Sequence, residues 1–353
     1  MWHRKSVRNW RAGLIGAAGA ALLWPSVAAA QTAITHCGPV AADSVLVADL
    51  TASPGDPGPC LKVVADDVTL NLNGHTVDVR ALGPAGTAIA VEHRARVRIE
   101  GSTTPGVRAT LLAGFASSSG QPAAVVVRNS QSISLAGLRI VNSEPRRSWC
   151  PEPASRFGAG ILLEDVAASR VFSNQVECFA IGIAARAGSQ APPSRIEYNV
   201  LLNDSNPLLP SAGLVLVGVT GWQVVGNFIS GSGSNRQPAA TGTEAPSGAL
   251  MLLDTSGCTL EANTVQNNPA PGIVLAGHSS ANRITGNTAQ GSMEPATGAI
   301  FADLWDRSLG RANTWEGNVC GQSRGRVAPQ GCPANPAYRP AHLTTKISVF
   351  TPH

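Results

Sequence analysis

A pattern of apolar and polar positions recurs about every 25 residues between Gly160 and Cys320, a period typical of solenoid repeats. Each unit carries a glycine, a short apolar run and then a fixed asparagine. The asparagines are Asn174, Asn199, Asn227, Asn263, Asn287 and Asn318. Three residues earlier stand Val171, Ile196, Val224, Leu260, Ile284 and Trp315, and two residues later stand Val176, Leu201, Ile229, Val265, Ala289 and Cys320. Because strand side chains alternate between two sides, each unit is predicted to hold two short strands that meet at a turn and share one apolar interior.

The same reasoning extends the array toward the N-terminus. Strands are expected at residues 44–50, 61–64, 68–79, 88–91, 97–99, 125–127 and 133–140, where Leu138 takes the place of an asparagine. Three Pro- or Ser-rich interruptions, at 142–158, 205–212 and 230–247, each precede the glycine that opens the next unit. Insertions that recur at one corner of a solenoid gather on one side, so we expect them to form the wall of a groove. The asparagines themselves are expected to be architectural, bonding to equivalent side chains on neighbouring coils.

Composition limits the function classes. Four basic residues precede the apolar stretch 12–23, and a small-residue site ends at Ala30, so residues 1–30 are predicted to be a secretory signal peptide. The chain of 353 residues has a formal charge of +4, and removal of the signal leaves 22 basic and 22 acidic residues. A neutral chain without a basic run among aromatics disfavours nucleic-acid binding. We expect one elongated domain at 31–332 with an N-terminal cap, a tail at 333–353, no further membrane span, and a monomer in the periplasm or outside the cell.

Seven cysteines in an exported chain predict disulfides with one thiol left over. Cys37 with Cys60 and Cys320 with Cys332 are the nearest pairs at the two ends. Cys150 stands one coil from Cys178. Cys258 is then the odd cysteine, and its place at the start of a strand predicts a buried, inert thiol.

Three runs, AGILLEDVAASRVFSNQV (159–176), AGLVLVGVTGWQVVGNFI (212–229) and PGIVLAGHSSANRITGNTA (271–289), resemble the repeats of the pectin-lyase-like superfamily. The opening CGPV and CLKVVADDVTLNLNGHTV (60–77) are similar to the start of many exported members. The resemblance implies an all-β fold, a right-handed parallel β-helix of about ten coils. It leaves the activity open, because the superfamily includes polysaccharide lyases, hydrolases, epimerases, esterases, copper-site maturation proteins and surface structural proteins.

In that superfamily the outward face of the strand after the glycine usually forms the substrate groove. The outward residue four positions after the glycine is Glu164, Arg186, Val217, Leu252 and Ala276 in successive units, and a one-residue shift adds Asp303. Extending the register backward adds Glu92 and Arg128. Since stacked strands lie about 4.8 Å apart, Glu92, Arg128, Glu164 and Arg186 are predicted to form one column of alternating charge.

Two interpretations of this column stay open. It is a ladder of surface ion pairs, each contributing at most about 1 kcal/mol, or it is a groove in which arginine neutralises a sugar carboxylate. In the second interpretation Arg128, Arg186, Glu164 and the turn residue His278 are the candidate catalytic residues. Lys62 and Lys346 are expected to lie outside the regular coils, so an arginine would serve as the base. Glu92, Asp303 and Trp149 are the candidate substrate-binding residues.

Calcium is the cofactor that a lyase of this fold would bring, and two acidic pairs, Glu164 with Asp165 and Asp303 with Asp306, offer two carboxylates each. The acidic pairs of the hydrolases and the signatures of alginate epimerases and pectate lyases are missing. The prediction is therefore an exported protein that binds or modifies an extracytoplasmic polysaccharide, with β-elimination of uronate glycans as the specific activity. The alternatives are a non-catalytic envelope or carbohydrate-binding module and, with less support, a copper-site maturation protein.

Overall fold

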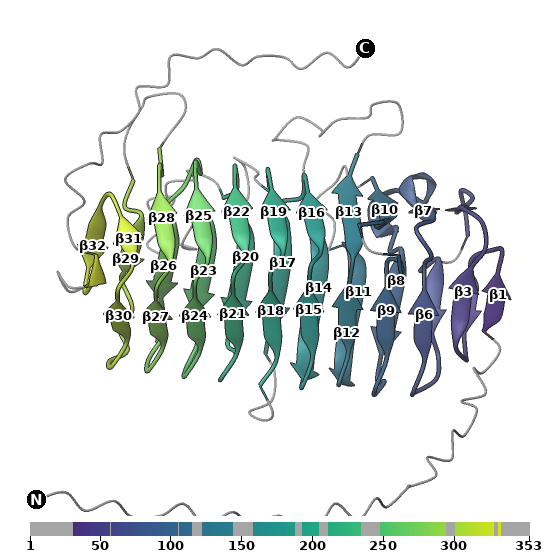
Figure 1. The fold of residues 1–353 in the computed structure, drawn as a ribbon, viewed down its shortest axis with the longest axis horizontal. Helices are drawn as coiled ribbons and strands as arrows, with labels where there is room; N and C mark the ends of the chain where they lie inside the picture. Colours follow the sequence, from purple (N-terminus) through teal and green to yellow (C-terminus); the bar gives the residue numbers. More distant parts are fainter. Residues whose placement is uncertain are drawn as a thin grey trace, which may run out of the picture. The chain divides into compact units, whose positions relative to one another are not determined.

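A computed structural model describes residues 31–56, 58–104, 106–114, 122–143, 158–187, 193–204, 211–233, 248–293, 301–327 and 331–332. Each turn of the chain contributes one strand to each of three parallel sheets, in the order sheet B, sheet A, sheet C (Figure 1). Since parallel crossover connections are almost always right-handed, the fold is the right-handed parallel β-helix that the repeat predicted.

The strands are short and regular. Sheet A contains β1 (Thr32–Ile34), β3 (Ser44–Leu46), β6 (Thr69–Asn71), β9 (Arg98–Glu100), β12 (Ser134–Ala136), β15 (Arg170–Phe172), β18 (Arg195–Glu197), β21 (Gln223–Val225), β24 (Thr259–Glu261), β27 (Arg283–Thr285) and β30 (Thr314–Glu316). Sheet B contains β2 (Gly38–Val40), β5 (Leu61–Val63), β8 (Ile89–Glu92), β11 (Ala123–Gln131), β14 (Ala159–Ala167), β17 (Ile181–Arg186), β20 (Ala212–Val217), β23 (Leu250–Leu253), β26 (Ile273–Ala276), β29 (Leu304–Asp306) and β32 (Ser323–Gly325).

Sheet C contains β4 (Leu50–Thr51), β7 (Thr76–Asp78), β10 (Ala109–Ala113), β13 (Leu138–Asn142), β16 (Gln175–Glu177), β19 (Val200–Leu202), β22 (Phe228–Ser230), β25 (Thr264–Gln266), β28 (Thr288–Gln290) and β31 (Val319–Cys320). A 3-10 helix, η1 (Arg80–Ala85), follows β7. The expected single strand at 68–79 is divided into β6 and β7, because Asn73 and Gly74 adopt positive φ values of 51° and 79° and turn the chain.

The asparagine ladder is confirmed. Each asparagine is buried, and the side-chain amide of each except the last, Asn318, donates to the next along the stack, as in Asn174 to Asn199 (3.0 Å) and Asn263 to Asn287 (2.9 Å). The preceding turn residue has positive φ, for example Ser173 at 56° and Gly226 at 64°. Leu138 stands at the head of the ladder, as expected, and its backbone N–H donates to Asn174 Oδ1 (3.0 Å).

The interior is filled by apolar side chains from all three sheets, including the predicted residues three before and two after each asparagine. The close approach of neighbouring rungs explains why several units begin with a glycine. A Cβ on Gly182 would lie 2.5 Å from the carbonyl oxygen of Gly213, so no side chain fits there.

The three long interruptions share one corner of the solenoid. Their flanking strands show that each leaves sheet C and enters sheet B, from β13 to β14, β19 to β20 and β22 to β23. Most of their residues, and the whole of 1–30 and 333–353, lie outside the described part of the chain. The signal peptide and the tail therefore stay predictions.

Candidate functional site

The predicted charged column exists on the outward side of sheet B. Arg128 pairs in register with Glu92 on one side and Glu164 on the other, and Glu164 pairs with Arg186. Each of these positions immediately follows an inward apolar residue of its strand, such as Val127 before Arg128, so strand alternation places the charge outside. The four side chains therefore lie on four successive rungs.

Arg128 is the centre of this column. Its Nε donates to Glu164 Oε2 (2.6 Å) and its Nη1 donates to Glu92 Oε1 (3.4 Å). The hydrogen bond and the charge of Glu164, followed by those of Glu92, raise the pKa of Arg128 above its ordinary value. The guanidinium is thus held in its protonated form, which disfavours the expected use of Arg128 as a base. Its side chain remains 40% exposed, so it stays accessible to a ligand.

Lys62 lies in sheet B one rung before Glu92, which corrects the expectation that it lies outside the regular coils. It belongs to β5, pairs in register with Ala90, and places Nζ 3.6 Å from Glu92 Oε2. The sequence pattern missed it because the earliest rungs carry no asparagine at the ladder position to mark their register. The charged column itself is Glu92, Arg128, Glu164 and Arg186, and Lys62 reaches Glu92 from the neighbouring outward position, the one occupied by Ala90 on the next rung.

Two hollows adjoin the column. The first, here called the N-terminal hollow, has a volume of about 620 Å³ and is lined by Lys62 together with His36, Asp49, Asp56 and the disulfide of Cys37. The second, here called the corner hollow, has a volume of about 420 Å³ and lies where sheet B turns toward sheet A. The corner hollow is lined by Asp66, His93, Arg94, Ala95, Asn129, Ser130, Gln131, Asp165 and Ala167. Neither was foreseen, because each joins residues from several rungs.

A second outward column of sheet B is apolar and covered. Its members, which precede the charged column by two residues, are Val126, Leu162, Ala184, Val215, Met251 and Val274, and they are at most 7% exposed. On this outward face the charged column is exposed to solvent at Arg128 and Glu164, whereas the apolar column is not. The expected groove is therefore restricted to the edge of sheet B that carries the charged column.

Beyond Arg186 the column becomes apolar, and two predicted members are wrong. Arg186 pairs with Val217, which pairs with Leu253 and not with Leu252. Leu252 faces the interior and is fully buried. The error arose because Gly248 was taken as equivalent to Gly213, whereas the register opposes Ala249 to Gly213 and Gly272.

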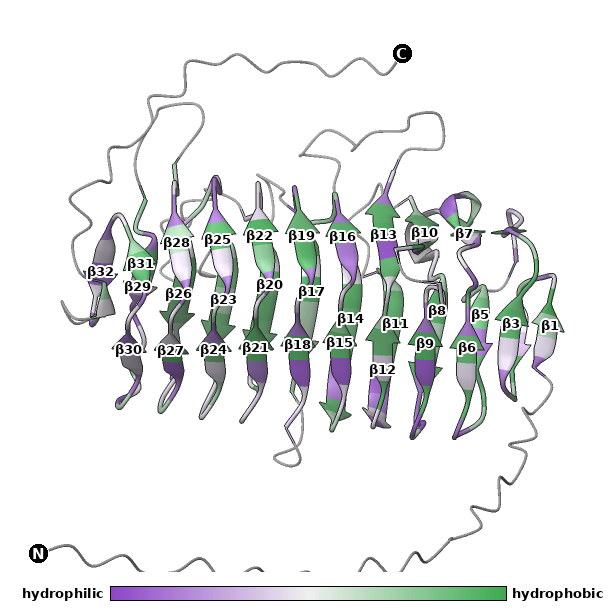
Figure 2. Cartoon of the chain, in the orientation of Figure 1, coloured by the Kyte–Doolittle hydropathy of each residue, from purple (hydrophilic) through white to green (hydrophobic). Residues whose placement is uncertain are grey.

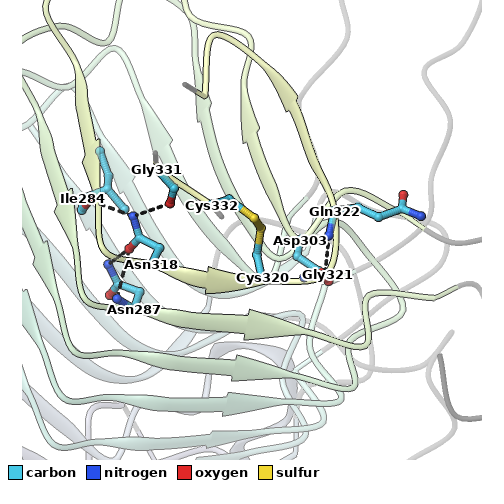
Figure 3. The surroundings of a disulfide bond; sticks show 9 residues. All are labelled: Ile284, Asn287, Asp303, Asn318, Cys320, Gly321, Gln322, Gly331 and Cys332. Atoms are coloured by element: carbon cyan, nitrogen blue, oxygen red, sulfur yellow. Dashed lines mark hydrogen bonds between the residues drawn. A yellow bond between two sulfur atoms is a disulfide. The ribbon is translucent and has the colours of Figure 1, made fainter. Parts of the chain in front are cut away.

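The same counting of residues from the glycine also placed Asp303 wrongly on the outward face. It precedes β29 and is fully buried at the C-terminal end of the solenoid, where its carboxylate accepts hydrogen bonds from the backbone N–H groups of Gly321 (2.8 Å) and Gln322 (3.0 Å) (Figure 3). Ser292 N donates to its other oxygen (3.2 Å). Burial raises the pKa of Asp303 above its ordinary value. The residue ties the last rungs together and does not face a groove.

The other candidate residues are not brought to the column. His278 is exposed on the turn after β26, as expected, and three rungs separate Ala276 from Arg186. At about 4.8 Å per rung, His278 is roughly 14 Å from Arg186, too far for a shared reaction. Trp149 lies outside the described residues. Trp222 is buried in the interior, so it is not available to stack on a sugar.

The cysteine predictions hold where the structure describes them. Cys37 is bonded to Cys60 and Cys320 to Cys332 (Figure 3). Cys178 is also disulfide-bonded, and its expected partner, Cys150, lies outside the described part. Cys258 is free and buried, and desolvation raises its pKa to about 11.

The acidic pairs proposed for calcium do not converge. Asp306 is 2% exposed and accepts hydrogen bonds from Ser308 Oγ (2.6 Å) and Trp315 Nε1 (3.1 Å). Asp165 follows Glu164 at a turn and lines the corner hollow. Within the described ranges no group of three or more His, Cys, Asp or Glu side chains is placed to hold a metal ion. Over the same ranges no helix is long and apolar enough to cross a membrane.

A second charged surface, on sheet A, was missed by the sequence reasoning. Figure 2 shows hydrophilic residues in β9, β15 and β18. Arg170 and Arg195 are neighbours in the register and both bond Glu197, at 2.7 and 3.4 Å. The carboxylate of Glu197 is 7% exposed, so these arginines hold a nearly buried partner.

Comparisons with known proteins give this chain no family and no activity. No family model matches the sequence, and no curated protein matches it. The structure is similar to that of the periplasmic alginate epimerase AlgG, with 8% identity and a TM-score of 0.46 over 81% of this chain and 70% of that one. It is similar to the A-module of the Azotobacter vinelandii mannuronan C-5 epimerase AlgE4, with 13% identity and a TM-score of 0.36 over 82% and 91%. PfbA, a surface adhesin of Streptococcus pneumoniae, has 12% identity and a TM-score of 0.40 over 82% and 81%. No activity follows from likeness at this level.

Proposed function

We propose that this protein is exported and binds an acidic polysaccharide along the charged column of sheet B. The observation that carries the proposal is the set of cations Lys62, Arg128 and Arg186 along one edge of sheet B, with Glu92 and Glu164 between them. Arg128 and Arg186 lie two rungs apart, which is about 10 Å, with Glu164 between them. A glycan lying parallel to the solenoid axis would therefore meet both guanidinium groups.

Arg128 has the donors that such a ligand requires. A guanidinium carries five N–H groups, and the bonds to Glu164 and Glu92 use one on Nε and one on Nη1. The others are available to a sugar carboxylate. Because an exposed ion pair contributes at most about 1 kcal/mol, exchanging part of it for a ligand carboxylate costs little stability.

The arrangement supports binding better than β-elimination. Elimination needs a base that removes a sugar proton, and the pKa of Arg128 is raised by its two carboxylate neighbours. His278 lies three rungs beyond Arg186. A uronate lyase would thus have to draw its base from Lys62 or Arg186.

Export and disulfide formation fit together in this proposal. The described chain contains the bonded pairs Cys37–Cys60 and Cys320–Cys332, which form and persist in oxidising compartments. Such a compartment, periplasmic or extracellular, is also where acidic polysaccharides are met.

Binding of alginate, pectate and glycosaminoglycans, measured by isothermal titration calorimetry at low and high salt, tests the proposal. We expect one acidic glycan to bind, with affinity that falls as salt rises and that drops at least tenfold in Arg128→Ala. Arg283→Ala, on the sheet A surface, is the matched control and leaves binding unchanged, because Arg283 and its partner Glu316 are both exposed. Equal losses in both variants, or no binding to any acidic glycan, contradict the proposal. Absorbance of unsaturated uronates in the same mixtures separates a lyase from a binding protein.

A further inference from the structure

The corner hollow has a composition different from that of the charged column. One wall is formed by His93, Asn129 and Asp165, which directly follow the column residues on three successive rungs. All three have positive φ, at 57°, 47° and 51°, so the chain turns at the same point on each rung. Gln131 and Asp66 also line this hollow. The three rungs thus present a polar recess and no apolar side chain larger than alanine.

Arg94 is the unusual member of this recess. Its Nε is buried, and within the described chain no acceptor lies in hydrogen-bond range of that atom. Its backbone N–H is satisfied by Ser130 Oγ (3.1 Å), so Nε is the donor that is left without an acceptor. A buried N–H without an acceptor is destabilising. An oxygen atom of a ligand would remove that cost.

The charges of the recess select the kind of ligand. Two carboxylates, Asp66 and Asp165, stand with one guanidinium, Arg94. Asp66 uses Oδ1 to accept from Ala95 N (3.0 Å), which leaves its other oxygen as an acceptor. A ligand with its own carboxylate would face an excess of negative charge, whereas hydroxyl groups would donate to the carboxylates and accept from Arg94.

We propose that the corner hollow binds a neutral sugar unit, with Arg94 as its central donor. Asn129 and Gln131 each carry an amide that donates and accepts, which suits the paired hydroxyls of a pyranose ring. The volume of about 420 Å³ lies in the range of small-molecule sites. This inference shares with the proposed function, and rests on it for, only the class of ligand, a glycan. It assigns a site distinct from the charged column.

Saturation-transfer NMR with a panel of neutral gluco-, galacto- and manno-oligosaccharides tests this site, with affinities taken from titration. At least one neutral class is expected to bind to the wild type, and Arg94→Gln is expected to weaken that binding at least tenfold. Arg96→Ala is the matched control, because Arg96 is exposed and paired with Asp67 next to the recess. Circular dichroism confirms that each variant is folded.

The outcomes separate the two sites. Loss of neutral-sugar binding in Arg94→Gln, with binding retained in Arg128→Ala, supports the corner hollow whether or not acidic glycans bind. No binding by any neutral oligosaccharide, or an equal loss in Arg96→Ala and Arg94→Gln, overturns it. Binding of acidic glycans that depends on Arg128, with no neutral oligosaccharide bound, supports the column and overturns the hollow.

Discussion

Substitution of Asn227 by alanine offers a direct test of the asparagine ladder. The Nδ2 atom of Asn227 donates to Asn263 Oδ1 (3.0 Å) and to the carbonyl oxygens of Ile196 (2.9 Å) and Val225 (3.2 Å). Its Oδ1 accepts from the backbone N (2.9 Å) and the Nδ2 (3.0 Å) of Asn199. Alanine removes all of these bonds and leaves the buried backbone N–H of Asn199 without an acceptor.

The magnitude follows from these contacts. A net hydrogen bond contributes about 1 kcal/mol, and a buried group left unsatisfied costs about 1–3 kcal/mol. Because the Nδ2 of Asn199 keeps its bond to the Val171 carbonyl (2.9 Å), the whole ladder is not lost. We therefore expect Asn227→Ala to lower the free energy of unfolding by about 3–5 kcal/mol.

Urea unfolding, followed by circular dichroism and tryptophan fluorescence, measures this loss. Arg283→Ala is the control, since Arg283 is exposed and so is its ion pair with Glu316, and a change within about 0.5 kcal/mol is expected. The slope of the free energy against urea concentration should stay constant between the variants. A loss below about 1 kcal/mol for Asn227→Ala, or one equal to that of the control, would refute the reasoning.

Three further predictions concern other parts of the chain. Cys258 should resist alkylation at pH 8 in the folded protein and react after denaturation, because a pKa of about 11 leaves little thiolate; rapid native labelling in mass spectrometry would contradict this. Replacing both Cys37 and Cys60, 23 residues apart, by serine should lower the free energy of unfolding by about 3 kcal/mol, measured in urea. The N–H of Thr76 and then His75 lower the pKa of Asp49 below 3.8, so its contribution to stability is present above that pH and lost as pH falls through the lowered value. Asp49→Asn should weaken the fall of the free energy of unfolding at acidic pH. An unchanged pH dependence in this variant would contradict the contribution of Asp49 with Thr76 and His75.

The charged column shows which outward residues can be predicted by counting positions from the glycine of each unit. Glu164 and Arg186 were placed correctly because their strands have the same length from the glycine to the outward residue. The count failed at Leu252 because the equivalent position on that rung is Ala249, not a glycine. Glycine is required only where a neighbouring backbone leaves no room for a Cβ, so it does not mark the register on every rung.

Asp303 and Lys62 failed for related reasons. Asp303 follows an interruption of the repeat, and its burial depends on backbone N–H groups of Gly321 and Gln322 that arrive one rung later. Lys62 lies in a rung without an asparagine at the ladder position, and its relation to Glu92 depends on the pairing of β5 with β8. Neither relation leaves a periodic signal in the chain.

The sequence by itself determined the period, the inward and outward positions of the regular rungs, the ladder and the alternating charges from Glu92 to Arg186. These follow from strand alternation, which acts within a few residues and repeats on every coil. Only the tertiary structure decided which polar residues share the corner hollow, where Arg94 is left without an acceptor for Nε. A recess is formed by differences between neighbouring rungs, and those differences depend on how far each turn projects when the rungs are stacked.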